Sequence, residues 1–312
     1  MKRESFGSRL GFILVSAGCA IGIGNVWKFP YICGAYGGAA FILIYLCFLV
    51  ILGIPVLVAE FAVGRGSHTS VAKCFDKLAP AGSCWKPLKF IGIIGCYMLM
   101  MFYTTVGGWM IYYCVKSLRG DFVGATPEAV TQSFSDMLGN APTMMLWMVI
   151  ICLIGFAVCF MGLQNGIEKI SKVMMSALLI IMVILAVHSV MMEGAGEGIS
   201  FYLIPDFQKI KEAGVGNVVF AALSQSFFTL SIGIGAMLIF GSYLDKSRSL
   251  TGEAVSITVL DTFVALTAGF IIIPACFSYN LDVGAGPSLL FVTLPTILQD
   301  IPLGRLFAVI LY

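Results

Sequence analysis

Two short segments of this sequence combine glycine residues with oxygen-bearing side chains in the middle of apolar runs. The first, AIGIGN, covers residues 20–25, and the second, TLSIGIG, covers residues 229–235. Each glycine weakens a helix by about 1 kcal/mol relative to alanine, and lipid tolerates unpaired backbone only where protein buries it or a wet cavity receives it. Close helix packing through small residues is the simpler explanation, but packing would not require the same pattern twice. The repeated pattern favours broken helices whose freed carbonyl and amide groups hold an ion or a solute.

Few other residues have the spacing that catalysis or metal binding needs. The sequence contains no G-x-S-x-G, no H-E-x-x-H and no paired aspartates, so an enzyme is not indicated. Its ten cysteines include no C-x-x-C pair, which argues against a zinc site and against a disulfide framework. Glu60 lies deep in an apolar run, and the sequence places no histidine or second acid near it. We expect Glu60 to accept hydrogen bonds from amides freed at the second break, with Tyr45 and Gln225 nearby.

The composition identifies a protein that crosses a membrane several times. Hydrophobic residues make up 59% and charged residues 11% of the sequence, and the mean hydropathy is +1.00, which excludes an ordinary soluble domain. The net charge of +2 and the lack of a dense basic run exclude nucleic acid as a partner, so the expected surroundings are a lipid bilayer. We expect membrane-spanning helices near residues 10–32, 39–64, 88–115, 143–161, 168–192, 217–243 and 252–279, with an eighth that begins near Leu303.

The lysine and arginine residues indicate how these helices are oriented. Most of them fall in loops that face the cytoplasm when the N-terminus is inside, in agreement with the positive-inside rule. We therefore expect a multi-pass protein of the inner (plasma) membrane with a cytoplasmic N-terminus. The segment 280–302 should form a re-entrant or capping loop on the outer face. Only about ten residues remain from Leu303 onward, whereas a crossing needs roughly 20, so we expect the chain to be part of a longer protein.

Four motifs of this sequence resemble a known family of transporters. They are GNVWKFPYICGAYGGAAF at 24–41, GIPVLVAEFAVGR at 53–65, SFFTLSIGIGA at 226–236 and LDTFVALTAGF at 260–270. The family is that of the neurotransmitter:sodium symporters, and the likeness is to its bacterial amino-acid branch. It implies an all-α polytopic membrane protein with the inverted-repeat, leucine-transporter-like helix bundle, in which the first and sixth helices are broken. Residues 1–195 would be the first five-helix repeat, and residues 196–312 an incomplete second repeat.

The resemblance also implies two sodium sites. The ligands of the first would be one carbonyl and three side chains: Ala20, Asn25, Thr229 and Asp261. The second would use the carbonyls of Gly18 and Ile21, and its remaining ligands would belong to the eighth helix. Oxygen ligands of this kind suit a hard cation.

Chloride is not expected as a cofactor. Chloride-dependent relatives pair a neutral Asn with a Ser one turn later, where this chain has Asp261 and Ala265. A fixed carboxylate can do the electrostatic work of the anion beside sodium. We also expect a proton to bind Asp261 once sodium leaves, so that uptake responds to internal pH.

The substrate pocket implied by the resemblance lies around the two breaks. Its residues would be Cys19, Ala20, Gly22, Leu99, Tyr103, Val106, Phe228, Ser231 and Ile234. Monoamine carriers have an aspartate at the position of Gly22, so a glycine favours an amino acid whose own carboxylate occupies that space. Tyr103 fits a hydroxyl donor to that carboxylate, although a tyrosine in mid-membrane can equally be a helix-packing residue. Val106 and Ile234 suggest an aliphatic or aromatic side chain.

The family's gates and its fifth helix have counterparts here. The gate residues would be Arg3, Phe6 and Tyr243 on the inner side, Lys28 and Phe29 on the outer side, and Phe228. Lysine at position 28 keeps the charge of the arginine that is more usual there but loses its two-pronged hydrogen bonding. In helix five the family often has a glycine followed ten residues later by proline, where this chain has Gly166 and Ser176.

The function implied is a sodium-coupled symporter that imports an amino acid by alternating access. Helices one, two, six and seven would move against a scaffold that includes helices three, four and eight. A non-transporting, receptor-like paralogue that binds an amino acid, or an inactive fragment, remains the alternative.

Overall fold

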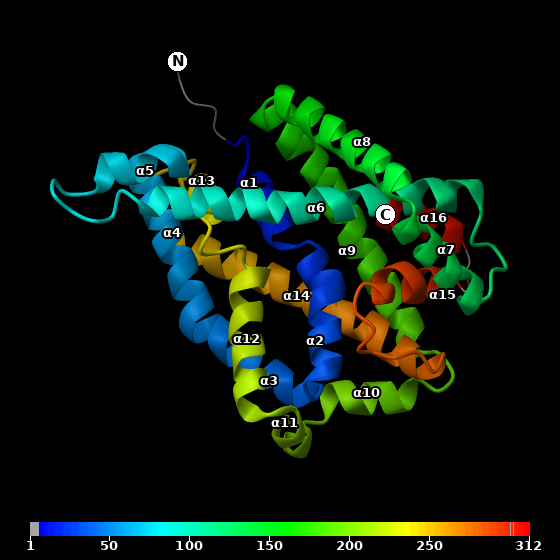
Figure 1. Cartoon of the computed structure of the whole chain (residues 1–312). Coiled ribbons are helices and arrows are strands. Elements are labelled where there is room, and N and C mark those ends of the chain that lie inside the picture. The colour runs from blue at the N-terminus through cyan, green and yellow to red at the C-terminus, as the bar shows by residue number, and fades with distance from the viewer. Residues whose placement is uncertain (1–5, 300, 302) are drawn as a thin grey trace.

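The chain folds into a bundle of helices that cross one another around a buried centre (Figure 1). The structure, a computed structural model, describes residues 6–299, 301 and 303–312. These residues are mostly helical and include no β-strand. The all-α architecture expected from the sequence is therefore confirmed.

The first span is broken, as its glycines predict. Helix α1 (Arg9–Ala20) ends at Ile21, where the backbone turns extended with φ −72° and ψ 106°. The chain resumes as a π-helical turn, η1 (Gly24–Lys28), and continues as α2 (Phe29–Ala35). The two halves are bent by 55°. The break thus lies at the segment where the sequence places Gly22 and Gly24.

Long apolar helices make up most of the remaining bundle. The described part of the chain contains five helices that are long and apolar enough to cross a membrane, or six if α1 and the bent segment that follows it count as one span. The five are α3 (Ala39–Phe48) with η2 (Leu49–Gly53) and α4 (Ile54–Ser67), α6 (Leu88–Arg119), α8 (Ala141–Phe160), η3 (Leu163–Glu168) with α9 (Lys169–Val190), and α14 (Leu250–Ser278). Each agrees with an expected span to within a few residues at most ends.

The sixth span is also broken. Helix α12 (Val215–Thr229) and helix α13 (Ala236–Gly241) are separated by residues 230–235. Within that segment Ser231, Gly233 and Gly235 have positive φ, at 52°, 92° and 78°. A left-handed backbone costs glycine little but strains other residues, which explains why glycines are placed here.

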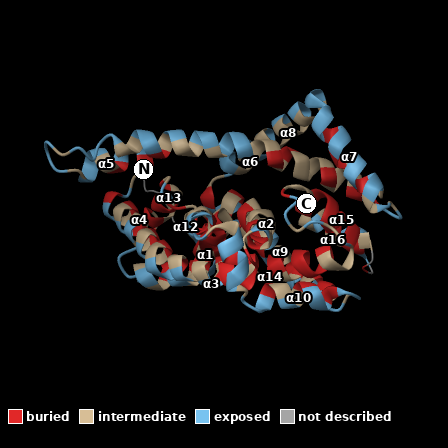
Figure 2. Ribbon diagram, turned by 60° about the horizontal axis from the view of Figure 1, so that its bottom comes forward, coloured by how far each residue is buried: buried red, intermediate tan, exposed pale blue. Residues whose placement is uncertain are grey.

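Burial separates the helices at the centre from those at the periphery. Figure 2 shows the buried residues gathered around α14 and α1, whereas α6 and α8 are largely pale along their length. Helix α8 buries none of its residues, and 61% of the apolar window of α14 is buried. A helix that is apolar on all sides yet exposed is one that faces lipid. Helix α14 therefore lies at the centre of the bundle, where it packs against both halves of the first broken span and is joined to the sixth by the hydrogen bond from Thr229 to Asp261.

The connecting segments contain short helices that the sequence analysis did not predict. They are α5 (Val71–Leu78), α7 (Pro127–Gly139), α10 (Ala195–Leu203) and α11 (Phe207–Ala213). The expected capping segment forms η4 (Leu289–Thr293) and α15 (Leu294–Gln299), whose apolar residues are buried, with Phe291 stacked on Phe134 of α7. Helix α16 (Gly304–Leu311) then begins close to the expected start of the eighth helix.

Candidate functional site

The side chains of Asn25, Thr229 and Asp261 form one hydrogen-bonded cluster in the core. The Asn25 amide donates to Asp261 Oδ1 at 2.8 Å, and the Thr229 hydroxyl donates to Asp261 Oδ2 at 2.7 Å. All three residues are completely buried. None of the ion pairs between described residues includes Asp261, so only neutral donors offset its charge. A small cation would complete the compensation that a buried carboxylate requires.

The break in the first span leaves backbone oxygens unpaired next to this cluster. Within the described part of the chain, no hydrogen bond ends on the carbonyl of Gly18, Ala20 or Ile21. The amide N–H of Gly22 turns instead to Asn25 Oδ1, at 3.3 Å. A carbonyl that is unpaired and shielded from lipid is free to bind an ion. These three carbonyls are the ones that the sequence analysis assigned to the two sodium sites.

Two side chains of the sixth span tie the two breaks together. The hydroxyl of Ser231 donates to the Cys19 carbonyl at 3.1 Å, and the amide of Gln225 donates to the Gly24 carbonyl at 3.2 Å. The breaks are therefore held face to face, although the bonded residues are 212 and 201 positions apart in the chain.

Helix α6 presents a stripe of residues to the breaks. Tyr103 faces Gly22, where a Cβ would lie 3.5 Å from the tyrosine hydroxyl. Leu99 and Val106 fall one turn away from Tyr103 on either side, and side chains at this spacing share a helix face. Val106 is 1% exposed. The structure thus brings Gly22 and Tyr103 together, and the helical period places Leu99 and Val106 on the same face.

Ile234, in the break of the sixth span, lies against the part of α6 that precedes Leu99. It packs against Gly92 and Gly95 of α6, and its carbonyl accepts a hydrogen bond from the Cys96 thiol at 3.6 Å. Cys96 was not predicted as a site residue, although its position three residues before Leu99 was a usable signal. Sequence reasoning also missed Met175 of α9, whose sulfur would lie 3.2 Å from a Cβ at Gly18.

Two of the predicted gate residues, Lys28 and Phe228, contact each other. The Lys28 ammonium lies 3.7 Å from the centre of the Phe228 ring, which is the geometry of a cation–π contact. Phe29, by contrast, is completely buried, with its ring 5.3 Å from that of Tyr45.

At the other predicted gate, Phe6 and Tyr243 contact each other edge to face, with ring centres 5.7 Å apart. Phe6 also packs on Phe12 of α1, at 5.5 Å. Arg3, the third residue expected at this gate, lies outside the described residues.

The expected role of Glu60 is confirmed. Its carboxylate accepts hydrogen bonds from the amides of Gly233 at 2.6 Å and Leu238 at 3.2 Å, on either side of the break in the sixth span. Of the two expected neighbours of Glu60, Tyr45 is wrong, and no hydrogen bond between described residues joins Gln225 to Glu60. Tyr45 lies 15 residues earlier on the same long helix, or about 22 Å at 1.5 Å per residue, and Gln225 bonds to Gly24 instead.

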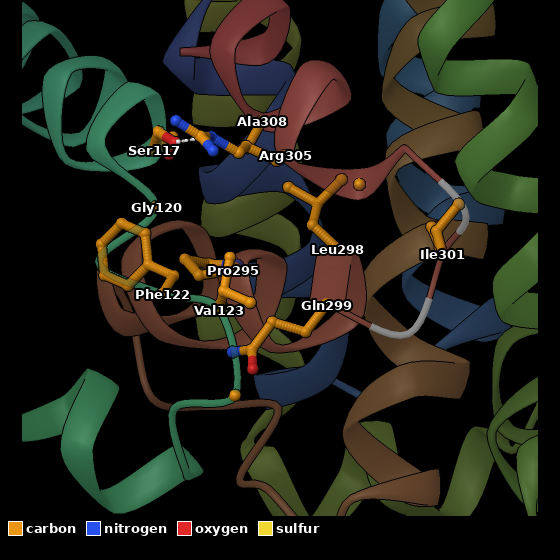
Figure 3. Close-up of a pocket in the computed structure, with 12 residues that line it drawn as sticks. Ser117, Gly120, Phe122, Val123, Pro295, Leu298, Gln299, Ile301, Arg305 and Ala308 are labelled. Atoms are coloured by element: carbon orange, nitrogen blue, oxygen red, sulfur yellow. Dashed lines mark hydrogen bonds between the residues drawn. The ribbon is translucent and has the colours of Figure 1, made fainter.

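A separate cavity of about 100 Å³ lies where the end of α6 meets α15 and α16 (Figure 3). Arg305 reaches across it and donates to the carbonyls of Ser117 and Leu118 in the last turn of α6, where the Ser117 carbonyl also accepts the amide of Gly120. The described residues that line this cavity include none of the predicted site residues, so it lies apart from the candidate site.

Known transporters match this sequence along the whole chain. The sequence model of the sodium:neurotransmitter symporter family matches residues 3–133 and 128–312. A sodium-dependent transporter of Bacillus subtilis, YhdH, is 36% identical over 306 residues, which cover 98% of this chain and 67% of that protein. A sodium-dependent transporter of Haemophilus influenzae is 32% identical over 320 residues, which cover 100% of this chain and 69% of that protein.

A solved structure shares the fold. The crystal structure of MhsT in complex with L-phenylalanine has a TM-score of 0.92 and 38% sequence identity, over 99% of this chain and 69% of that one. The chain thus spans about two thirds of the length of these proteins. The matches run in order through both broken helices and through α14, which together form the buried cluster. The chain belongs to the sodium:neurotransmitter symporter family, a family of sodium-coupled membrane transporters.

Proposed function

We propose that this chain forms the core of a symporter that uses inward sodium movement to import an amino acid with an apolar or aromatic side chain. The observation that carries the proposal is the buried cluster of Asn25, Thr229 and Asp261, which joins both broken helices and lacks a cation partner among the described residues.

In this proposal the first sodium ion binds between the cluster and the Ala20 carbonyl. Four oxygens from three helices would replace water around the ion, and the Asp261 carboxylate would neutralise it. The second sodium ion binds the carbonyls of Gly18 and Ile21. Its support is that both carbonyls lack a hydrogen bond within the described residues.

The substrate occupies the space between the breaks and α6. The absence of a side chain at Gly22 leaves room beside the first sodium ion for the substrate carboxylate, and the Tyr103 hydroxyl faces that space. The main chain of Cys19 and Ala20 with Phe228 and Ser231 would surround the amino and carboxylate groups. An apolar side chain agrees with the Val106 and Ile234 surroundings, and a 38% identical relative was crystallised with L-phenylalanine.

Alternating access then follows from the two gates. Lys28 and Phe228 would close the outer path, and Phe6 with Tyr243 the inner path, in a protein of the inner (plasma) membrane with its N-terminus in the cytoplasm. The two inverted repeats, residues 1–195 and 196–312, would supply the moving helices and their scaffold.

The test uses purified protein in liposomes under an imposed inward sodium gradient. We expect labelled L-phenylalanine or L-leucine to accumulate with the sodium gradient and not with an equal potassium gradient. A receptor-like paralogue would bind the amino acid but would not accumulate it. Competition by each of the twenty amino acids would then define the substrate, and failure of all apolar ones to compete would refute the assignment of substrate class.

A further inference from the structure

Glu168 is a buried carboxylate that the transport site does not use. It is 3% exposed and lies where the π-helical segment η3 passes into α9. Its Oε2 accepts a hydrogen bond from the Gly7 amide at 2.8 Å. Its Oε1 accepts from the Ser8 hydroxyl at 3.3 Å and pairs with Lys172 at 2.6 Å. One carboxylate therefore holds the chain just before α1 against the start of α9, across 161 positions of sequence.

The absence of a side chain at Gly11 makes room for the Glu168 carboxylate. A Cβ built on Gly11 would overlap the Glu168 carboxylate itself, so any larger residue there must push the carboxylate out. A Cβ on Gly7 would lie at an ordinary contact distance of 3.6 Å and would leave the amide in place. The close approach therefore depends on Gly11 and not on Gly7.

The same contact is coupled to the cap of α1 and to the inner gate. The Ser8 hydroxyl that donates to Glu168 also accepts the amide of Gly11 at 3.0 Å, and this bond caps the helix. Phe6, one residue before Gly7, makes the edge-to-face contact with Tyr243. Release of Glu168 would therefore loosen the cap and the gate contact together.

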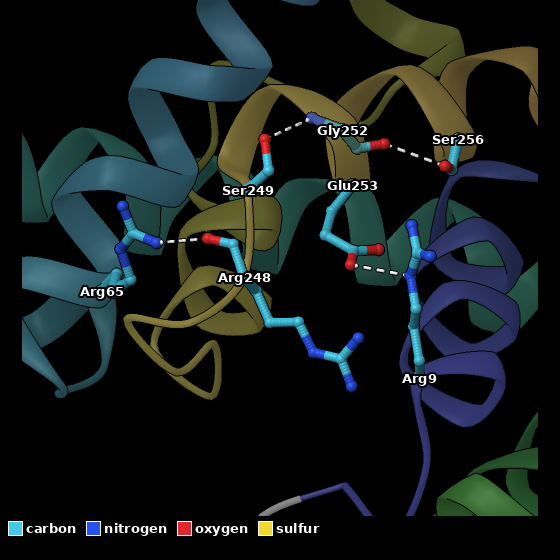
Figure 4. Close-up of polar contacts among 7 residues, drawn as sticks. All are labelled: Arg9, Arg65, Arg248, Ser249, Gly252, Glu253 and Ser256. Atoms are coloured by element: carbon cyan, nitrogen blue, oxygen red, sulfur yellow. Dashed lines mark hydrogen bonds and ion pairs between the residues drawn. The ribbon is translucent and has the colours of Figure 1, made fainter.

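A second carboxylate at this end of the molecule provides a contrast. Glu253 of α14 pairs with Arg9 at 3.0 Å (Figure 4). This pair joins helices one and seven, which belong to the same moving group in the proposed mechanism, and the Arg9 side chain is 53% exposed. Glu168, in contrast, joins helix one to helix five, which is outside that group.

We propose that Glu168 is the latch that holds the inner gate of the transporter shut, and that its release is a required step before sodium and substrate leave to the cytoplasm. This inference rests on the proposed transport function. Glu168 acts as a positioning residue, because it holds the backbone of the gate segment and touches neither ion nor substrate. The latch needs the carboxylate charge, the two donors at residues 7 and 8, and the bare backbone of Gly11.

The test compares Glu168→Gln and Gly11→Ala with two matched controls, Glu253→Gln and Gly7→Ala. Hydrogen–deuterium exchange of the peptide that contains residues 6–12 is measured with sodium bound. We expect both latch variants to exchange at least about tenfold faster there, the factor for loss of one hydrogen bond to a charged group. Both controls should stay within about threefold of wild type. The ion pair between Arg9 and Glu253 contributes little because the arginine is half exposed, and a Cβ on Gly7 would make only ordinary contacts. Exchange in the part of α14 away from Glu253, residues 260–278, should not change in any variant, which excludes general unfolding.

The transport readout is the sodium concentration that gives half-maximal uptake. A freed inner gate favours the inward-facing state, so both latch variants should need about tenfold more external sodium, and the controls should not. Equal exchange rates in Glu168→Gln and wild type, or equal effects of Glu168→Gln and Glu253→Gln, would overturn the latch. The exchange measurement does not depend on uptake, so absence of transport in the wild type would refute the proposed function without deciding the latch contact.

Discussion

Replacement of Asp261 by asparagine is the most direct test of the first sodium site. The substitution keeps the shape of the side chain and removes its charge. A unit charge about 4 Å from a bound ion attracts it by about 4 kcal/mol at an effective dielectric constant near 20. The side-chain oxygen of asparagine retains part of this attraction, and about 1.4 kcal/mol corresponds to a factor of ten. We therefore expect the apparent dissociation constant for sodium to rise about 100-fold.

The assay is binding of labelled substrate to purified protein as sodium is varied and ionic strength is held with choline. Asp121→Asn, at an exposed position beyond the end of α6, is the matched control and should bind as wild type does. A shift smaller than about threefold in Asp261→Asn would mean that the ion does not sit beside this carboxylate.

The same carboxylate predicts indifference to chloride. Asp261 and Ala265 are both completely buried on α14, and Ala265 has no hydroxyl to offer an anion. Wild-type uptake should persist when gluconate replaces chloride at constant sodium, and it should respond to internal pH if a proton replaces sodium on Asp261. Loss of uptake in gluconate would contradict the electrostatic argument.

Four further substitutions test other parts of the structure. Asn25→Ala and Thr229→Ala each remove a proposed ligand and a donor to the buried carboxylate, so each should raise the sodium requirement about tenfold or more in the same binding assay. Gly22→Asp should abolish amino-acid binding, because a second negative charge would point at Tyr103 and at the substrate carboxylate; near-native affinity in equilibrium binding would mean that the substrate lies elsewhere. Gly64→Ala should lower the midpoint of thermal unfolding, since its Cβ would overlap the backbone of α13 at a cost of about 1–3 kcal/mol, and an unchanged midpoint in a fluorescence-based melt would contradict that packing.

The breaks in the first and sixth spans could be predicted because their cause is local. Glycine weakens a helix wherever it stands, and the repeat of the pattern near residues 22 and 233 pointed to a shared role. The positions of the five long apolar helices were predictable because membrane thickness sets the length of each apolar run, whereas the sixth span is present only as two shorter helices on either side of its break.

The buried cluster is different, because no local pattern joins its members. Asn25 and Asp261 are 236 positions apart and meet only because α14 packs against the first broken span in the folded chain. Their association was inferred from family resemblance rather than from spacing. The wrong placement of Tyr45 near Glu60 arose in the same way. Two residues on one helix were both expected at one break, whereas the length of that helix keeps them about 22 Å apart.

The contact between Glu168 and the segment before α1 had no sequence signal at all. A glutamate followed four residues later by lysine is an ordinary helical pair, and Gly11 is one of 35 glycines in the chain. Only the packed structure shows that the carboxylate occupies the space where a Cβ of Gly11 would stand.

Position 231 needs a residue that accepts a left-handed backbone and also carries a hydrogen-bond donor. The backbone of Ser231 is left-handed, with φ 52°, and its hydroxyl donates to the Cys19 carbonyl across the two breaks. Glycine would accept the backbone but provides no donor, and threonine would provide the donor at the cost of a branched Cβ in a strained region. Asparagine tolerates the left-handed region and carries a donor, so it is the substitution best suited to both requirements. In a library randomised at this one position, the functional sequences should therefore be confined to serine, asparagine and a weaker glycine class.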